Sequence, residues 1–237
     1  MVKSAFNDSS LCPQPIRKAY KSISQILTED IREGILTGKF QEGQYLRQPG
    51  LARKYGVSQG AIREALRTLE AEGLVESQPR QGARVLRLSV QEIRELWEMR
   101  ILLEKHLVRH AVPALTDADL ALAGRLIKAM ETERNPVRWL ALNRQFHNSL
   151  YRRSGRFRIL RFAANHRGMM ERYLRVRLGV LKLFGVATKE HRQILAACRS
   201  RNTSLAMRCI ERHLQRTADS VVEFLESSHG DGHSVEE

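Results

Sequence analysis

Apolar residues recur at helical spacing along most of the 237-residue chain, and short strand-like runs interrupt this pattern around residue 80. Ahead of the interruption, Ser58 is placed to cap a helix and Gly73 to end it. Gln78–Gly82 is typical of a tight turn between two strands. The elements predicted for this part are helices at about 17–37, 48–55 and 59–72, then strands at 74–77 and 83–86.

From Ser89 onward the pattern is helical, and breaks at proline, glycine and asparagine divide it into segments. Thr116, followed by acidic residues, is predicted to cap one of them. The predicted helices span 90–111, 117–134, 137–153, 156–183, 187–199 and 203–227.

The pattern therefore predicts a mainly α protein with two domains. An N-terminal winged helix-turn-helix is expected at 16–87, and a C-terminal antiparallel all-α helical bundle at 88–228. We expect a flexible arm at 1–15 and a disordered tail at 229–237, because these segments have little to bury.

The net charge of +14 makes a polyanionic partner plausible, since a basic surface gains by displacing counterions from phosphates. Most of the excess lies after residue 87, outside the predicted winged helix, so charge alone supports nucleic-acid binding only weakly. No apolar run approaches the ~20 residues of a membrane span, and the first residues do not resemble a secretory signal. The three cysteines have neither disulfide nor zinc-site spacing. We expect a cytoplasmic protein with no membrane partner.

The helix, turn, helix and hairpin arrangement points to DNA reading. An α-helix fits the major groove, and the first residues of the second helix of such a pair lie closest to the base edges. Glutamine can pair with adenine, arginine can pair with guanine or phosphate, and a helix N-terminus binds phosphate. The candidate DNA-binding residues are Ser58, Gln59, Gly60, Arg63 and Arg67, with Arg80 and Gly82 in the wing.

Three histidines of the predicted bundle share an inward-facing position. His147, His191 and His213 each lie in register with apolar residues of a separate helix, and Asn143 precedes His147 by one turn. Converging imidazoles with one oxygen donor form a natural divalent-metal site. The alternative is that each ring is a core histidine with its own hydrogen-bond partner.

The segment Tyr55–Val75, with Leu46–Ala52 before it and the wing after it, resembles the GntR family of bacterial regulators. The bundle resembles the FCD-type C-terminal ligand domain of the FadR-like subfamily. This resemblance implies contact of Ser58, Gln59, Arg63 and the wing glycine region with double-stranded, palindromic operator DNA. The family often has Arg-Thr-Pro where this chain has Gln59-Gly60-Ala61, which leaves the operator sequence open.

The same resemblance implies a metal held by one Asp and three His, with zinc, nickel or another transition metal as candidates. Asn143 stands at the Asp position and removes one negative charge from the ligand set. It also implies a small organic acid as effector, and Arg100 and His166 are its candidate ligands. Arg100 has a second interpretation, a buried ion pair with Glu104.

The leading hypothesis is a homodimeric transcriptional repressor, not an enzyme, whose operator affinity is switched by a small carboxylate. The alternative is a metal-dependent hydrolase built on the histidines. It lacks an obvious general base, because Glu190 is adjacent to His191 and is expected to point elsewhere. An RNA-binding module would need exposed aromatic residues, and aromatics are only 6% of the chain. The many arginines between 152 and 177 are opposed locally by Glu171 alone. A solvated helix face is the ordinary interpretation, attraction of an anionic effector or of the DNA backbone is the alternative, and the spacing does not choose between them.

Overall fold

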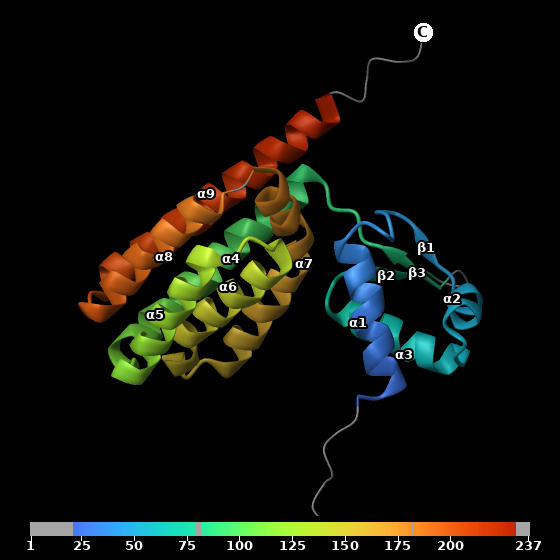
Figure 1. Cartoon of the computed structure of the whole chain (residues 1–237), viewed down its shortest axis with the longest axis horizontal. Helices are drawn as coiled ribbons and strands as arrows, with labels where there is room; N and C mark the ends of the chain where they lie inside the picture. The colour runs from blue at the N-terminus through green and yellow to red at the C-terminus, as the bar shows by residue number, and fades with distance from the viewer. Residues whose placement is uncertain (1–20, 79–81, 182, 231–237) are drawn as a thin grey trace, which may run out of the picture.

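The chain folds into two parts, each with its own hydrophobic core, that are joined through residues 86–89 (Figure 1). The computed structural model describes residues 21–78, 82–181 and 183–230. One core contains residues between Leu27 and Val85, and the other contains residues between Ile93 and Val222. The arm predicted at 1–15 and Arg80 of the predicted wing lie outside the described residues.

Helices α1, α2 and α3 and a small antiparallel sheet form the N-terminal part. Ser22 starts the first helix through a capping box with Gln25, and Ser58 caps the third by accepting from the Ala61 backbone N–H at 3.3 Å, which confirms the predicted cap. The elements are α1 Ile23–Leu36, β1 Tyr45–Leu46, α2 Gln48–Tyr55, α3 Gln59–Ala71, β2 Val75–Gln78 and β3 Gly82–Val85.

The sheet has the order β1-β3-β2, and its first strand was not predicted. Two residues are too few to give an alternating pattern, so β1 is recognisable only through its pairing of Leu46 with Ala83. Gly82 has φ +98°, and a Cβ there would lie 2.7 Å from the Leu46 carbonyl oxygen. A glycine is therefore required at this end of β3 for the close approach of the two strands.

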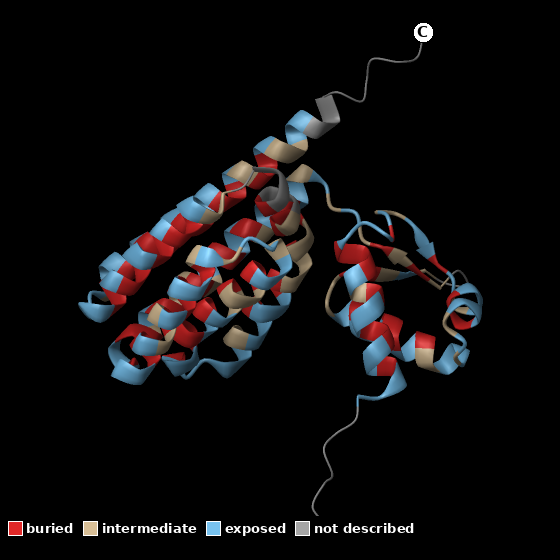
Figure 2. Ribbon diagram, in the orientation of Figure 1, coloured by how far each residue is buried: buried red, intermediate tan, exposed pale blue. Residues whose placement is uncertain are grey.

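Long helices form the C-terminal part, and their buried residues run as stripes that face one another (Figure 2). Thr116 forms a capping box with Asp119, as the sequence predicted. Among the described residues, no helix has the length and apolarity that crossing a membrane requires. The elements are α4 Val90–Ala111, a 3₁₀ turn at Val112–Ala114, α5 Asp117–Thr132, α6 Pro136–Tyr151, a 3₁₀ turn at Arg152–Ser154, α7 Phe157–Leu181, α8 Phe184–Arg199 and α9 Thr203–Gly230.

Three helix boundaries differ from those predicted by three residues or more. Helix α1 begins at Ile23 rather than at about 17, because Ser22 caps it. Helix α8 begins at Phe184 rather than 187, because Gly185 lies in the exposed first turn, where a glycine does not interrupt packing. Helix α9 continues to Gly230, past the predicted end at 227 and into the predicted tail, whose last residues 231–237 lie outside the described part. Helix ends carry few packing contacts, so the apolar pattern locates them poorly.

Helix α7 connects the two parts through a set of polar contacts (Figure 1). Arg175 binds Glu33 of α1 in a bidentate ion pair, with N···O distances of 2.8 and 2.9 Å. The Tyr173 hydroxyl donates to Glu42 at 3.1 Å, and a Cβ added to Gly73 would lie 2.7 Å from Met169. Helix α1, the loop that follows it and the end of α3 therefore contact one helix of the bundle.

The arginines between 152 and 177 form the expected solvated helix face only in part. Arg156, Arg158 and Arg161 are exposed, whereas others of the set pair with carboxylates. Arg167 is buried against Glu104, and the other paired arginines also bind carboxylates that are distant in sequence. Counting charges along the chain misses such partners because they come from other helices. The pairs are Arg152–Asp119, Arg153–Asp119, Arg172–Glu42 and Arg175–Glu33.

Candidate DNA-reading groove and histidine cluster

A groove of about 1120 Å³ lies between α3, the start of α2 and the hairpin of β2 and β3. Gln59, Arg63 and Arg67 line its helical wall, and Gly82 lies on its hairpin side. The groove therefore brings together the candidates of the predicted reading helix and the described base of the wing. Ser58 and Gly60 are exposed at the start of α3.

The arginines of this groove are available to a ligand. Arg63 and Arg67 are exposed, and neither belongs to an ion pair within the described residues, whereas Arg32 and Arg84 of the same part bind Glu72 and Glu76. An exposed guanidinium without a carboxylate partner can bind phosphate or a guanine edge at no cost of breaking an existing pair.

Sequence reasoning missed Arg47, which lines the same groove. It follows β1 directly and stands at the N-cap of α2, where it makes no side-chain capping bond. The unrecognised strand hid its position, because only the pairing of β1 with β3 brings this end of α2 beside the hairpin.

The three predicted histidines converge in the bundle from α6, α8 and α9. Possible ligand atoms of His147, His191 and His213 all lie within 4.8 Å of one another. The rings are buried, with exposed fractions of 0%, 0% and 5%. Three imidazoles at this separation can share one bound ion.

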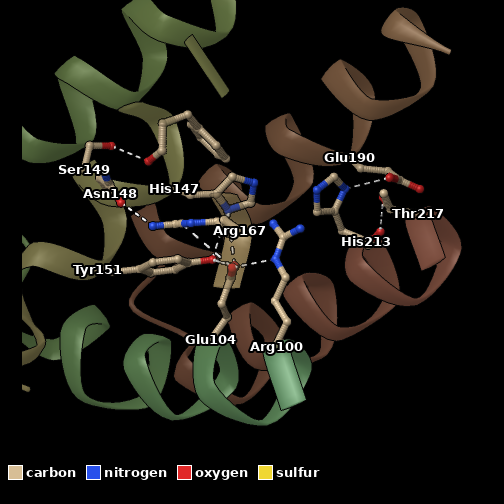
Figure 3. Close-up of polar contacts among 11 residues, drawn as sticks. Arg100, Glu104, His147, Asn148, Ser149, Tyr151, Arg167, Glu190, His213 and Thr217 are labelled. Carbon is tan, nitrogen blue, oxygen red and sulfur yellow. Dashed lines mark hydrogen bonds and ion pairs between the residues drawn. The ribbon is translucent and has the colours of Figure 1, made fainter. Parts of the chain in front are cut away.

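A chain of hydrogen bonds from α4 orients His147 (Figure 3). The Tyr151 hydroxyl donates to Glu104, so its oxygen accepts from Nδ1 of His147 at 3.0 Å. Nε2 of His147 is then a buried acceptor that no residue of the described ranges pairs with. Carboxylate-linked orientation of this kind is typical of metal-binding histidines.

Glu190 orients His213 from the other side (Figure 3), and our expectation that it points elsewhere was wrong. Its Oε2 accepts from Nδ1 of His213 at 2.8 Å, and its Oε1 accepts from Arg216 at 3.1 Å. Adjacency to His191 on α8 turns Glu190 towards α9, and α9 packs closely enough to meet it there. Burial opposes ionisation of Glu190, but the contacts with His213 and Arg216 outweigh it and lower the carboxyl pKa.

Several buried polar atoms in this cluster have no hydrogen-bond partner among the described residues. They are Nε2 of His147, both ring nitrogens of His191 and the Oδ1 atom of Asn143. An unpaired buried polar atom costs roughly 1–3 kcal/mol, so their grouping on facing helices calls for a shared ligand. Imidazole nitrogen and amide oxygen donors fit a transition-metal ion.

Burial lowers the pKa values of His147 and His191 well below the usual range, and neighbouring histidines and Arg100 add to this effect. Both rings are therefore neutral at physiological pH. A neutral imidazole is the form that coordinates metal ions.

Arg100 forms the buried ion pair with Glu104 that was one of its two predicted roles, and its guanidinium also extends to the histidine cluster. Its Nε donates to Glu104 at 2.8 Å, while the guanidinium is directed towards the space between His147 and His213 (Figure 3). A cavity of about 20 Å³ is lined by Arg100, Asn143 and His213, together with apolar residues that include Leu174 of α7. His166 is buried, but among the described residues it belongs neither to the cluster nor to the cavity lining.

A winged helix with exposed, unpaired arginines, joined to a helical bundle with a buried polar site, defines a DNA-binding regulator. Residues 19–85 match the model "Bacterial regulatory proteins, gntR family", and residues 95–216 match the FCD domain. The chain belongs to the GntR family and carries an FCD domain; it is a transcriptional regulator rather than an enzyme.

Known relatives support the same assignment. The chain is 28% identical to the HTH-type transcriptional repressor GlaR of Escherichia coli K12 over 195 residues, which are 78% of this chain and 89% of the relative. A GntR-family regulator from Pseudomonas syringae pv. tomato is 32% identical, with TM-score 0.57 and 88% of each chain covered. E. coli McbR/YncC, at 21% identity, shares the fold with TM-score 0.72 over 87% of this chain and 100% of its own.

Proposed function

We propose that this chain is a homodimeric repressor whose operator affinity is controlled by a small organic acid bound beside a divalent metal ion. Repression is supported by the name of the relative GlaR. Dimerisation is supported by the use of helix-turn-helix proteins in pairs on two-fold operators. The predicted DNA-contacting residues are Ser58, Gln59, Gly60, Arg63, Arg67, Arg80 and Gly82, and Arg47 joins them.

The metal is proposed to be zinc or nickel, held by His147, His191 and His213 with the amide oxygen of Asn143 as a further ligand. The observation that carries this proposal is the set of unpartnered nitrogen and oxygen atoms in one buried cluster. Such an ion supplies a Lewis-acidic centre for a carboxylate. Arg100 binds the same carboxylate through its guanidinium, while Glu104 holds the Arg100 side chain in place.

The hydrolase alternative finds no support in this geometry. Glu190 is the carboxylate nearest to the ring of His213, and both of its oxygens already accept hydrogen bonds. A general base needs a free oxygen within reach of the attacking water.

Metal content tests the proposal directly. Wild-type chain purified in a buffer that contains a small carboxylate should hold about one equivalent of zinc or nickel per chain by mass spectrometry, as expected for a tri-histidine site. His147→Ala and His191→Ala should lose it, whereas His106→Ala, a histidine of α4 outside the cluster, should keep it. Equal metal in all four proteins would contradict the proposed ligand set.

The link to DNA is tested with an operator selected from random duplexes by the wild-type chain. Chelation of the metal, followed by restoration with zinc, should change operator affinity reversibly in the wild type. The same treatment should leave His191→Ala unchanged. If operator affinity does not depend on metal in any of these proteins, the proposed control by metal is wrong, whereas the proposed DNA binding is unaffected.

A further inference from the structure

The buried charges beside the histidine cluster do not balance. Arg100 and Arg167 are 2% and 5% exposed, and both form ion pairs with Glu104, Arg100 through Nε at 2.8 Å and Arg167 through Nη1 at 3.8 Å. Glu104 is fully buried and is the carboxylate counter-ion that the two arginines share. Within the described residues, no other carboxylate pairs with either arginine. The pair of arginines and one carboxylate therefore carry one net positive charge.

The candidate ligand set adds no negative charge to compensate. His147, His191 and His213 are imidazoles, and Asn143 offers a neutral amide. Glu190 faces the outer nitrogen of His213, and its charge is matched by Arg216. A divalent cation bound here would sit beside the Arg100 guanidinium with neutral donors only, in a buried site where charge repulsion is poorly screened.

We propose, on the basis of the metal site proposed above, that the cation and a carboxylate anion bind as an obligate pair. The cavity lined by Arg100, Asn143 and His213 lies where an anion touches both positive charges at once. The anion offsets the repulsion between cation and guanidinium, and the cation supplies the anion with a second partner. Each ligand alone binds weakly, and each strengthens the other by the same factor.

Asn143 is the residue that creates this dependence. An aspartate has the same shape and would supply a permanent negative charge at the end of the ligand set. With asparagine in this place, the charge has to come from the ligand that the protein senses. Metal loading is then part of the response to the acid rather than a fixed property of the fold.

Competition of the full-length chain with a chromophoric zinc chelator tests the pairing. Formate, the smallest carboxylate, serves as the probe, and sodium nitrate at equal ionic strength is the reference. Each condition is calibrated with chelator and zinc alone. Formate should raise the zinc affinity of the wild type by about tenfold or more, within the usual range of coupling between linked ligands. Zinc should raise the affinity for formate by an equal factor.

Asn143→Asp should bind zinc more tightly than the wild type in nitrate and should lose most of the formate enhancement. Asn202→Asp, which adds the same charge at the exposed start of α9, should behave as the wild type. Zinc binding that is equally tight in formate and nitrate, with Asn143→Asp no tighter, would overturn the pairing but leave the metal site standing. Absence of zinc from wild type and Asn143→Asp in both salts would overturn the metal site itself.

Discussion

The arginines of the N-terminal part have two different roles, one structural and one available for ligand binding. Arg32 forms a two-point contact with Glu72 at 2.6 and 2.8 Å, which ties α1 to the end of α3. Arg63 stands on the groove wall without such a partner in the described residues. The first arginine stabilises the fold, and the second is free to bind an external anion.

Replacement of Arg63 by alanine should therefore weaken operator binding by about 1–3 kcal/mol and relax sequence preference if the side chain reads a base. Fluorescence anisotropy over a range of salt concentrations measures both effects. Arg94→Ala removes an exposed helical arginine from α4 and serves as the matched control. Arg94→Ala should have the operator affinity of the wild type and the same dependence of affinity on salt. An equal loss of affinity in both variants would contradict a direct contact between Arg63 and DNA.

At the scale of single elements, α7 contacts both the cavity beside the histidine cluster and the N-terminal part. Leu174 lines the cavity, and its neighbours Tyr173 and Arg175 bind Glu42 and Glu33 of the N-terminal part. Successive residues of a helix point about 100° apart, so one turn of α7 faces both neighbours. The cavity of about 20 Å³ is close to the space of one water molecule, so a larger acid has to displace its walls. A displaced Leu174 moves the helix that carries Arg175.

The Arg175–Glu33 pair should hold the two parts together in a pH-dependent way. Hydrogen bonding to Arg175 lowers the Glu33 pKa below its usual range, so the pair is fully formed above that range. The contact is lost as pH falls through the lowered value. Arg175→Gln and Glu33→Gln should each increase the radius of gyration measured by small-angle X-ray scattering at pH 7, and the double variant should add little more. A purely additive double variant would show that the two residues act separately.

The difference between wild type and Arg175→Gln should shrink as the pH is lowered below the ordinary glutamate range, since protonation removes the charge that Arg175 binds. The scattering profiles are compared at matched concentration, with circular dichroism as the check that both proteins remain folded. A difference that persists unchanged at low pH would assign the contact to Met169 and Gly73 rather than to the ion pair.

The features that could be predicted from the sequence are those that depend on residues close together in the chain. The α3 helix, its Ser58 cap and the inward positions of His147, His191 and His213 follow from residues close together in the chain. The β1 strand, the contact of Glu190 with His213 and the partners of the arginines after residue 151 do not. Each depends on the packing of helices or strands that are distant in sequence, which no local pattern specifies.

For the whole molecule, the proposed function requires two copies of the reading helix. Light scattering coupled to size exclusion should give twice the 27.2 kDa chain mass, and the selected operator should contain two inverted half-sites. Half-sites about one helical turn apart, or a multiple of it, would match a two-fold protein. A monomeric mass together with a single, non-repeated half-site would contradict this arrangement.

Helix α7 runs from Phe157 to Leu181, and among the described residues its polar contacts with the N-terminal part involve Glu33 and Glu42, which are neither predicted DNA-binding nor predicted metal-binding residues. The proposed DNA contacts, the proposed metal and effector ligands, and the contacts between the two parts thus use three separate sets of side chains. In an engineered biosensor, the strength of the response to the effector could therefore be adjusted at the contacts between the two parts, which are made by Glu33, Glu42, Arg172 and Arg175. Changes there would reset the dose–response curve while the promoter sequence and the detected analyte stay the same.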